Sequence, residues 1–390
     1  MRIRSVISLT SLLALVVAAC AAPSTLVPAR PTTPPPQPTS VPTQPATKLP
    51  QPTATPTKPP VTPTPAGPRT LTLLTHESFA LSDAVIKEFE SANNATLKLI
   101  KQPDAGQALT RAILVKDNPE ADMLFGVDNT FMSRALDADI LEVYEPAALS
   151  AIPAEFQLDN SSRLTPIDYG DVCLNYDKAY FAKKKLQPPQ SLADLTKPAY
   201  KNLLVVENPA GSSPGLAFML ATIDTIGQNN WLTYWKQLKD NGVKVVEDWN
   251  TAYYTEFSGS SGKGPRPMVV SYASSPPAEV VFANPPIDAP PTAAVTASGT
   301  CFRQVEFAGI LKGTQNRDLA EKWIDFMLSL RYQEDLPLNQ FVYPVHPDAK
   351  LPEVFDKWSV IATDPASLDP AVIAANRDKW IEQWTETVLK

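Results

Sequence analysis

The chain of 390 residues has few of the residues that catalysis or metal binding requires. It contains only two histidines, His76 and His346, and no HExxH, CxxC or Walker-type spacing. No GxSxG motif occurs, and a Ser-His-acid triad would have to use one of those two histidines. The sequence therefore predicts no catalytic residue, no metal ligand and no cofactor, and it favours a protein that is not an enzyme.

Acidic residues are missing from the first 69 residues, which carry six basic ones. The whole chain has 34 Lys+Arg and 41 Asp+Glu, so residues 70–390 hold 28 basic against 41 acidic groups, a formal charge of −13. This balance argues against a nucleic acid partner, because phosphates need a basic surface. It is compatible with a cationic small ligand.

The N-terminus is typical of an export signal. Basic residues in Met1–Arg4 precede an apolar stretch, and residues 1–19 end in small residues directly before Cys20. This arrangement resembles the bacterial lipobox, which implies cleavage before Cys20 and a lipid on its thiol. The alternative is an ordinary signal peptide with an incidental cysteine. We expect a lipid-anchored protein on the extracellular face of the cytoplasmic membrane, or in the periplasm.

Residues 20–68 consist mainly of Pro, Thr, Ala, Gln and Ser. They offer almost no large apolar side chains to bury, so folding could not offset their chain entropy. Proline favours extended polyproline II, at about 3.1 Å per residue. We expect a disordered linker that holds the folded part away from the membrane.

From residue 70 onward, strand-like segments alternate with amphipathic helical segments. Alternation of this kind predicts βαβ units and parallel sheets. The expected strands are 71–74, 96–100, 121–125, 168–176, 203–206, 243–246, 268–272 and 301–307, and the expected helices are 80–92, 106–116, 129–138, 214–226, 230–239, 250–258, 316–330 and 370–389.

About 320 folded residues exceed what one hydrophobic core usually serves, so two domains are expected. We predict an α/β fold of the bilobal type II clamp, with two lobes joined by crossing strands. Lobe 1 would begin with 69–167, lobe 2 would be 168–300, and 301–390 would return a strand to lobe 1 and add the C-terminal helices. A ligand would lie at the carboxyl ends of the strands, between the lobes.

The folded part contains two cysteines, Cys173 and Cys301, each on an expected strand. An exported chain meets an oxidising environment, where two such residues on neighbouring strands can pair. We predict a disulfide, with two buried free thiols as the alternative.

The adjacent residues Tyr253 and Tyr254 are the basis of a ferric-ion alternative, because bilobal ferric-ion binders use neighbouring tyrosines as ligands. Here the pair falls in an expected helix, where adjacent side chains point about 100° apart. At least one of the two is therefore expected in the core.

Eight short segments follow one another in a fixed order, and together residues 70–389 resemble the periplasmic thiamine-binding proteins of ABC importers. The resemblance rests on Thr75–Phe79, Gly126–Asn129, Asp168–Gly170 with Asn175–Lys178, Pro188–Leu192, Ser212–Leu216, Trp249 with Ala252–Tyr253, Ser271–Pro276, and Tyr343–Val345.

The resemblance implies that Trp249 and Tyr272 contact the ligand. Thiamine has a flat aminopyrimidine and a cationic thiazolium, and aromatic side chains stabilise both kinds of ring. The alternative for each residue is ordinary core packing. The resemblance also implies that Asp104 and Ala105 face the ligand, with capping of the helix at 106 as the alternative for Asp104.

One serine pair opens the helix expected at 214, where free N–H groups can bind a phosphate, and a second pair before a proline repeats the arrangement after Tyr272. They are Ser212 with Ser213, and Ser274 with Ser275, and simple helix capping is the alternative for the first pair. The resemblance completes the expected site with Ala273, His76 and Tyr343. The chain departs from the better-known members at three positions, with His76 and Ala278 in place of tyrosines and Phe341 in place of a tryptophan, so the aromatic cage is expected to be thinner.

The expected partners are thiamine or a thiamine phosphate and the permease subunit of an ABC importer, with the protein itself a monomer. The alternatives are another solute in the same fold, such as ferric ion or a polyamine, a sensory receptor domain, or an enzyme on the same scaffold.

Overall fold

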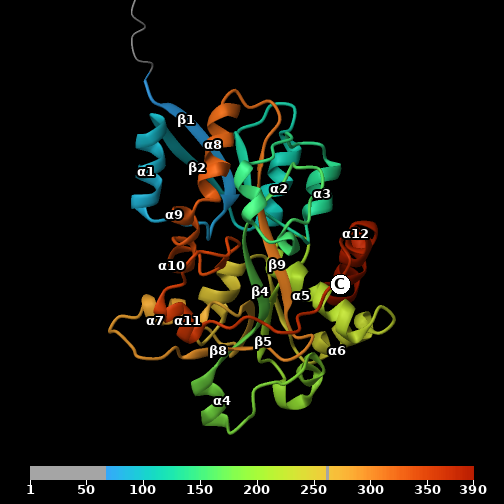
Figure 1. Cartoon of the computed structure of the whole chain (residues 1–390). Coiled ribbons are helices and arrows are strands. Elements are labelled where there is room, and N and C mark those ends of the chain that lie inside the picture. Colours follow the sequence, from blue (N-terminus) through green and yellow to red (C-terminus); the bar gives the residue numbers. More distant parts are fainter. Residues whose placement is uncertain (1–66, 261–262) are drawn as a thin grey trace, which may run out of the picture. The chain divides into compact units, whose positions relative to one another are not determined.

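A computed structural model describes residues 67–260 and 263–390 (Figure 1). The expected signal segment 1–19, the lipidated Cys20 and the linker as far as residue 66 lie outside the described residues. Those three expectations therefore stay predictions.

One mixed sheet of ten strands runs through the described residues, in the order β2-β1-β3-β9-β4-β7-β5-β6, with β8 and β10 pairing with β4. The strands are β1 Arg69–His76, β2 Ala95–Gln102, β3 Met123–Asp128, β4 Thr165–Asp177, β5 Leu204–Glu207, β6 Lys244–Val246, β7 Met268–Tyr272, β8 Thr292–Val295, β9 Phe302–Ile310 and β10 Tyr343–Pro344.

Helices cover this sheet. The α-helices are α1 Asp83–Asn93, α2 Ala105–Leu114, α3 Met132–Asp137, α4 Lys178–Lys184, α5 Ser213–Ile226, α6 Trp231–Asp240, α7 Pro276–Val281, α8 Arg317–Met327, α9 Leu330–Gln333, α10 Leu336–Asn339, α11 Glu353–Trp358 and α12 Pro370–Val388. The 3₁₀ turns are η1 Ala147–Ala151, η2 Ala154–Phe156, η3 Leu192–Thr196 and η4 Pro198–Tyr200, and η5 Thr251–Glu256 is a π-helical turn.

The long antiparallel pair β4 and β9 forms the centre of the sheet. On one side lie the parallel strands β1, β2 and β3 with α1, α2, α3 and α8, which we call the first lobe. On the other side, β7, β5 and β6 pack with α5 and α6, which we call the second lobe (Figure 1). The expected α/β fold with two lobes and crossing strands is confirmed.

Some elements differ from the sequence-based prediction. The helix expected over 250–258 is the π-helical turn η5, and the helix expected over 316–330 ends at Met327. Ser329 breaks the second helix because its side chain accepts a hydrogen bond from the backbone N–H of Tyr332 and begins α9. The strand β8 was not predicted, because its sequence TAAV has neither alternation nor bulk.

The C-terminal helix α12 contacts both lobes. Trp384 packs edge-on against Trp235 of α6, with ring centroids 5.3 Å apart. In the first lobe, the guanidinium of Arg377 lies 5.1 Å from the ring centroid of Phe131, directly before α3. The helix therefore bridges the lobes on the side marked by the C-terminus in Figure 1.

Cys173 on β4 and Cys301 directly before β9 form a disulfide, with an S–S distance of 2.10 Å and a Cα–Cα distance of 4.3 Å. The predicted pairing is confirmed, and the alternative of two free thiols is excluded. The bond fastens the two crossing strands to each other beside Ala273 and Ala362.

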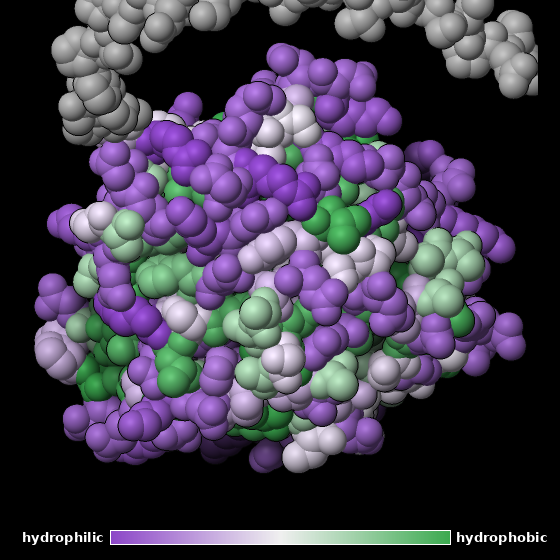
Figure 2. All heavy atoms as spheres, turned by 45° about the horizontal axis from the view of Figure 1, so that its top comes forward, coloured by the Kyte–Doolittle hydropathy of each residue, from purple (hydrophilic) through white to green (hydrophobic). Residues whose placement is uncertain are grey.

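Hydrophilic residues dominate the upper part of the face drawn in Figure 2, and apolar residues gather in patches below them. Within residues 67–260 and 263–390, no helix has both the length and the apolar character that crossing a membrane would take.

Candidate functional site

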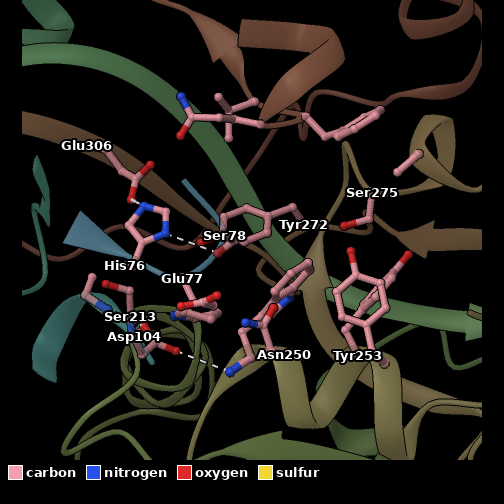
Figure 3. Close-up of a pocket in the computed structure, with 18 of the residues that line it drawn as sticks. His76, Glu77, Ser78, Asp104, Ser213, Asn250, Tyr253, Tyr272, Ser275 and Glu306 are labelled. Carbon is pink, nitrogen blue, oxygen red and sulfur yellow. Dashed lines mark hydrogen bonds and ion pairs between the residues drawn. The ribbon is translucent and has the colours of Figure 1, made fainter. Parts of the chain in front are cut away.

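A cleft of about 490 Å³ opens at the carboxyl ends of strands from both lobes, where the sequence placed a ligand. The first lobe contributes the loop after β1 and the start of α2. The second lobe contributes the start of α5, the loop after β6 and the end of β7. The lining residues are His76, Glu77, Ser78, Asp104, Ala105, Ser213, Pro214, Trp249, Asn250, Tyr253, Tyr254, Tyr272, Ser275, Ala278, Phe282, Glu306, Asn339, Gln340, Phe341 and Val342 (Figure 3).

Three aromatic side chains form one wall of the cleft. The Trp249 ring stacks on Tyr253, with centroids 5.0 Å apart and planes at 19°, and Tyr272 lies edge-on at 6.5 Å. The indole N–H of Trp249 donates to the hydroxyl of Ser271 at 3.0 Å, and the Tyr272 hydroxyl donates to Gln304 at 3.1 Å. These hydrogen bonds fix both rings, so the wall is formed before a ligand arrives.

The geometry of Tyr253 and Tyr254 does not suit an iron site. Their rings are inclined at 81°, and Tyr253 is buried while 45% of Tyr254 is exposed. The Tyr253 hydroxyl donates to Glu279 at 2.9 Å, and burial raises its pKa well above the usual value, so the phenol stays protonated. In the part of the chain that the structure describes, no group of three His, Cys, Asp or Glu could hold a metal ion.

Asp104 connects the two lobes inside the cleft. Its carboxylate caps α2 through the N–H of Ala105 at 2.8 Å. It also accepts the N–H of Ser213 at 3.1 Å and that of Trp249 at 3.3 Å, both from the second lobe. Burial raises the pKa of Asp104 to about 6, and these hydrogen bonds together with one from Ser212 oppose the rise. Asp104 therefore caps α2, which was the alternative role given for it, and it also lines the cleft.

The start of α5, where a phosphate was expected, is already occupied by that carboxylate. Ser212 is the N-cap and accepts the N–H of Gly215, while the N–H of Ser213 is directed to Asp104. No Lys or Arg occurs among the lining residues, and burial followed by the charge of Lys101 lowers the pKa of His76 to about 4. The walls of the cleft therefore carry negative and not positive charge, which favours a cation.

The remaining expected residues divide into two groups. Ser275 lines the cleft beside Tyr272. Ala273, Ser274 and Ser212 are buried and are not among the lining residues. Tyr343 lies on β10, stacks on an aromatic ring of β4 and donates its hydroxyl to a serine, so it supports the cleft from outside its lining.

Two phenylalanines meet at the rim. Phe282, directly after α7, contacts Phe341 at 5.5 Å between centroids. Phe341 has a φ of 57°, a left-handed conformation that is strained for a bulky side chain and is often found at functional sites. The sequence flagged Phe341 only as a departure from the family, and it gave no signal for Phe282.

The floor of the cleft is acidic, which the sequence analysis missed. Glu306 of β9 lines the cleft and pairs in register with Asp168 of β4. The ring nitrogen Nε2 of His76 lies 3.5 Å from a Glu306 oxygen. Acidic residues inside otherwise apolar strands, as in FRQVEFAGI, were the signal that could have revealed this floor.

Comparison with known proteins finds a matching family and similar binding proteins. Residues 118–362 match the family described as bacterial extracellular solute-binding protein. The thiamine-binding periplasmic protein of Salmonella typhimurium is 30% identical over 325 residues, which is 82% of this chain and 94% of that protein.

Solved structures agree in fold. A periplasmic thiamin binding protein superposes with a TM-score of 0.71 and 28% identity over 83% of this chain and 99% of that one. The iron-bound HitA of Pseudomonas aeruginosa gives a TM-score of 0.67 over 82% of this chain and 99% of that one, and at 20% identity it shows the fold alone.

Proposed function

The chain belongs to the family of bacterial extracellular solute-binding proteins, and we propose that it binds thiamine in its interlobe cleft and delivers it to the permease of an ABC importer. The thiamine-binding relatives support the ligand, and the chemistry of the cleft supports it independently. The observation that carries the proposal is the combination of stacked aromatic rings with an acidic floor in one cleft.

Each part of thiamine finds a matching surface. A flat heterocycle gains about 0.5–1.5 kcal/mol from an aromatic partner beyond its buried area. A cationic ring over Trp or Tyr gains roughly 0.5–2 kcal/mol more. Trp249 and Tyr272 offer such faces, and Glu306 offers a carboxylate beneath them.

Binding and release would involve no bond breaking in this protein. A ligand that contacts both lobes stabilises the closed arrangement by its differential affinity. Asp104 already joins the lobes through Ser213 and Trp249, so the closed arrangement has a polar contact of its own. The energy of transport would come from a separate ATPase, and a lipid on Cys20 would keep the protein at the extracellular face of the membrane.

We further propose that thiamine itself binds more tightly than its phosphates. The N–H of Ser213, which would hold a phosphate at the start of α5, already donates to Asp104, as does the N–H of Trp249 after β6. A phosphate beside that carboxylate and Glu306 would meet like charges without a basic side chain in the lining.

Thermal unfolding in the presence of thiamine, thiamine phosphates, ferric ion and spermidine tests the function. A ligand at about 100 times its dissociation constant stabilises the protein by roughly 2.7 kcal/mol, which raises the midpoint visibly. We expect a rise with thiamine that is lost in Trp249→Ala and reduced in Tyr272→Ala. Leu114→Ala, an exposed position in the first lobe and outside the cleft, is the matched control. A rise with ferric ion or spermidine alone would refute thiamine as the ligand.

A further inference from the structure

Two carboxyl groups face each other at the floor of the cleft. Asp168 of β4 and Glu306 of β9 are direct partners in the antiparallel ladder, a position that brings side chains onto the same face about 4.5–5.5 Å apart at Cβ. Asp168 is fully buried and Glu306 is 8% exposed, with its carboxyl reaching the cleft.

These two carboxyl groups differ from their acidic neighbours in having no donors. Asp128 accepts the N–H of Thr130, its hydroxyl and the side-chain amide of Gln304, and Asp104 accepts three backbone N–H groups. Neither oxygen of Asp168 has a hydrogen-bond partner among the described residues. Glu306 has only the His76 ring, at 3.5 Å.

The surrounding groups offer no compensating cation. The titratable groups that interact with the pair are His76 on β1, Asp128 on β3, Asp104 at the start of α2, Tyr272 on β7 and Tyr332 on α9, which also interacts with Asp335 after it. The nearby cations have other partners: Arg303 of β9 pairs with Asp171, and Lys101 of β2 donates to the backbone oxygen of Glu77. His76 is neutral because burial lowers its pKa. Two facing carboxylates without donors cannot both be ionised, so they hold one proton between them.

Building on the proposed function, we propose that Asp168 and Glu306 form the cation subsite of the cleft, and that the proton they share passes to solvent when the cationic ring of the ligand binds beside Glu306. In the free protein the proton links the two carboxyl groups. In the complex the fixed positive charge replaces it, so the floor changes from one negative charge to two while the ligand adds one positive charge.

The electrostatics of the pair agree with this exchange. Burial raises the pKa of both groups, and the pair raises that of Glu306 further. A positive charge within about 4–6 Å lowers a carboxyl pKa by about 1–3 units. A pKa that is lower in the complex than in the free protein makes binding stronger as the pH rises, by up to about tenfold per pH unit between the two values.

Isothermal titration calorimetry of the purified protein with thiamine, at pH 6 in phosphate and in Bis-Tris buffers of equal ionic strength, measures the proton directly. The difference in observed enthalpy between buffers of different ionisation enthalpy gives the number of protons released. We expect about 0.5–1 proton per ligand, with affinity rising from pH 5 to pH 7.5.

Two isosteric variants separate the roles of the pair. In Asp168→Asn the new amide can donate to Glu306, which stays ionised, so binding at pH 7.5 is retained while proton release and pH dependence disappear. In Glu306→Gln the charge facing the ligand is lost, so affinity at pH 7.5 falls about 10-fold or more, since the pKa shift above corresponds to about 10- to 1000-fold in affinity. Glu145→Gln removes a charge from an exposed position outside the cleft lining and keeps the proton release.

The outcomes distinguish this inference from the proposed function. Thiamine binding by the unmodified protein without proton release would overturn the inference and leave the function in place. Proton release that persists unchanged in both Asp168→Asn and Glu306→Gln would also overturn it, because the proton would then come from the ligand or another group. Absence of thiamine binding at any pH would overturn the proposed function itself.

Discussion

Replacing Asp104 by serine tests why phosphorylated ligands should be disfavoured. The Asp104 carboxylate accepts the backbone N–H of Ala105, Ser213 and Trp249 at 2.8, 3.1 and 3.3 Å. Serine is also a good N-cap, so α2 keeps its cap in the variant. The N–H groups of Ser213 and Trp249 lose their partner, and that of Ser213 lies at the positive end of the α5 dipole.

The expected change in selectivity follows from those two donors. A hydrogen bond to a charged group contributes about 1.5–3 kcal/mol, and one recovered by a phosphate corresponds to about 10- to 100-fold in affinity. The removed negative charge adds to the effect. We therefore expect the affinity for thiamine monophosphate, relative to thiamine, to rise about 10- to 100-fold in Asp104→Ser.

Calorimetric titration of both ligands at pH 7.5 and low salt measures this ratio. Glu77→Gln removes the same formal charge from the cleft lining without freeing a helix N-terminus, so its ratio should change no more than about threefold by exposed-charge effects. An unchanged ratio in Asp104→Ser, with the fold intact by circular dichroism, would refute the argument that Asp104 fills an anion site. Equal changes in both variants would show that net charge alone sets the selectivity.

Three further variants test the framework around the cleft. The double variant Cys173→Ala/Cys301→Ala should lose about 2–5 kcal/mol of unfolding free energy in urea, because the bond closes a loop of 128 residues in sequence separation; a loss below about 1 kcal/mol would contradict this. Arg303→Met should cost about 2–3 kcal/mol in the same assay, since it leaves the buried Asp171 without its ion pair and Arg303 is one-third exposed; an unchanged midpoint would contradict the pairing. Gly106→Ala would place a Cβ 2.6 Å from the backbone oxygen of Gly211 in the second lobe. Closure of the lobes should then cost about 1–3 kcal/mol, and the thiamine affinity measured by calorimetry should fall. Retained affinity would show that the lobes do not meet there in the bound state.

Several features of the site follow from local sequence. Trp249 and Tyr272 end or follow strands, and the carboxyl ends of strands in both lobes meet at one cleft, so their place was predictable. The hydrogen-bond partners at the start of α5 were not predictable from local sequence. Ser212 and Ser213 begin a helix as expected, but only the fold shows that Asp104, more than 100 residues away in sequence, accepts the N–H of Ser213.

The sequence by itself determined the alternation of strands and helices, the acidic balance, and the two cysteines suited to pair. The alternation follows from local patterning, with periods of 2 and 3.6 residues, and the charge balance and the cysteines follow from composition. The tertiary structure decided which charges meet. Asp168 and Glu306 lie 138 positions apart in the printed sequence, and only the antiparallel register of β4 and β9 brings them together without donors. Long-range register depends on packing of the whole sheet, and that packing sets the charge of the cleft.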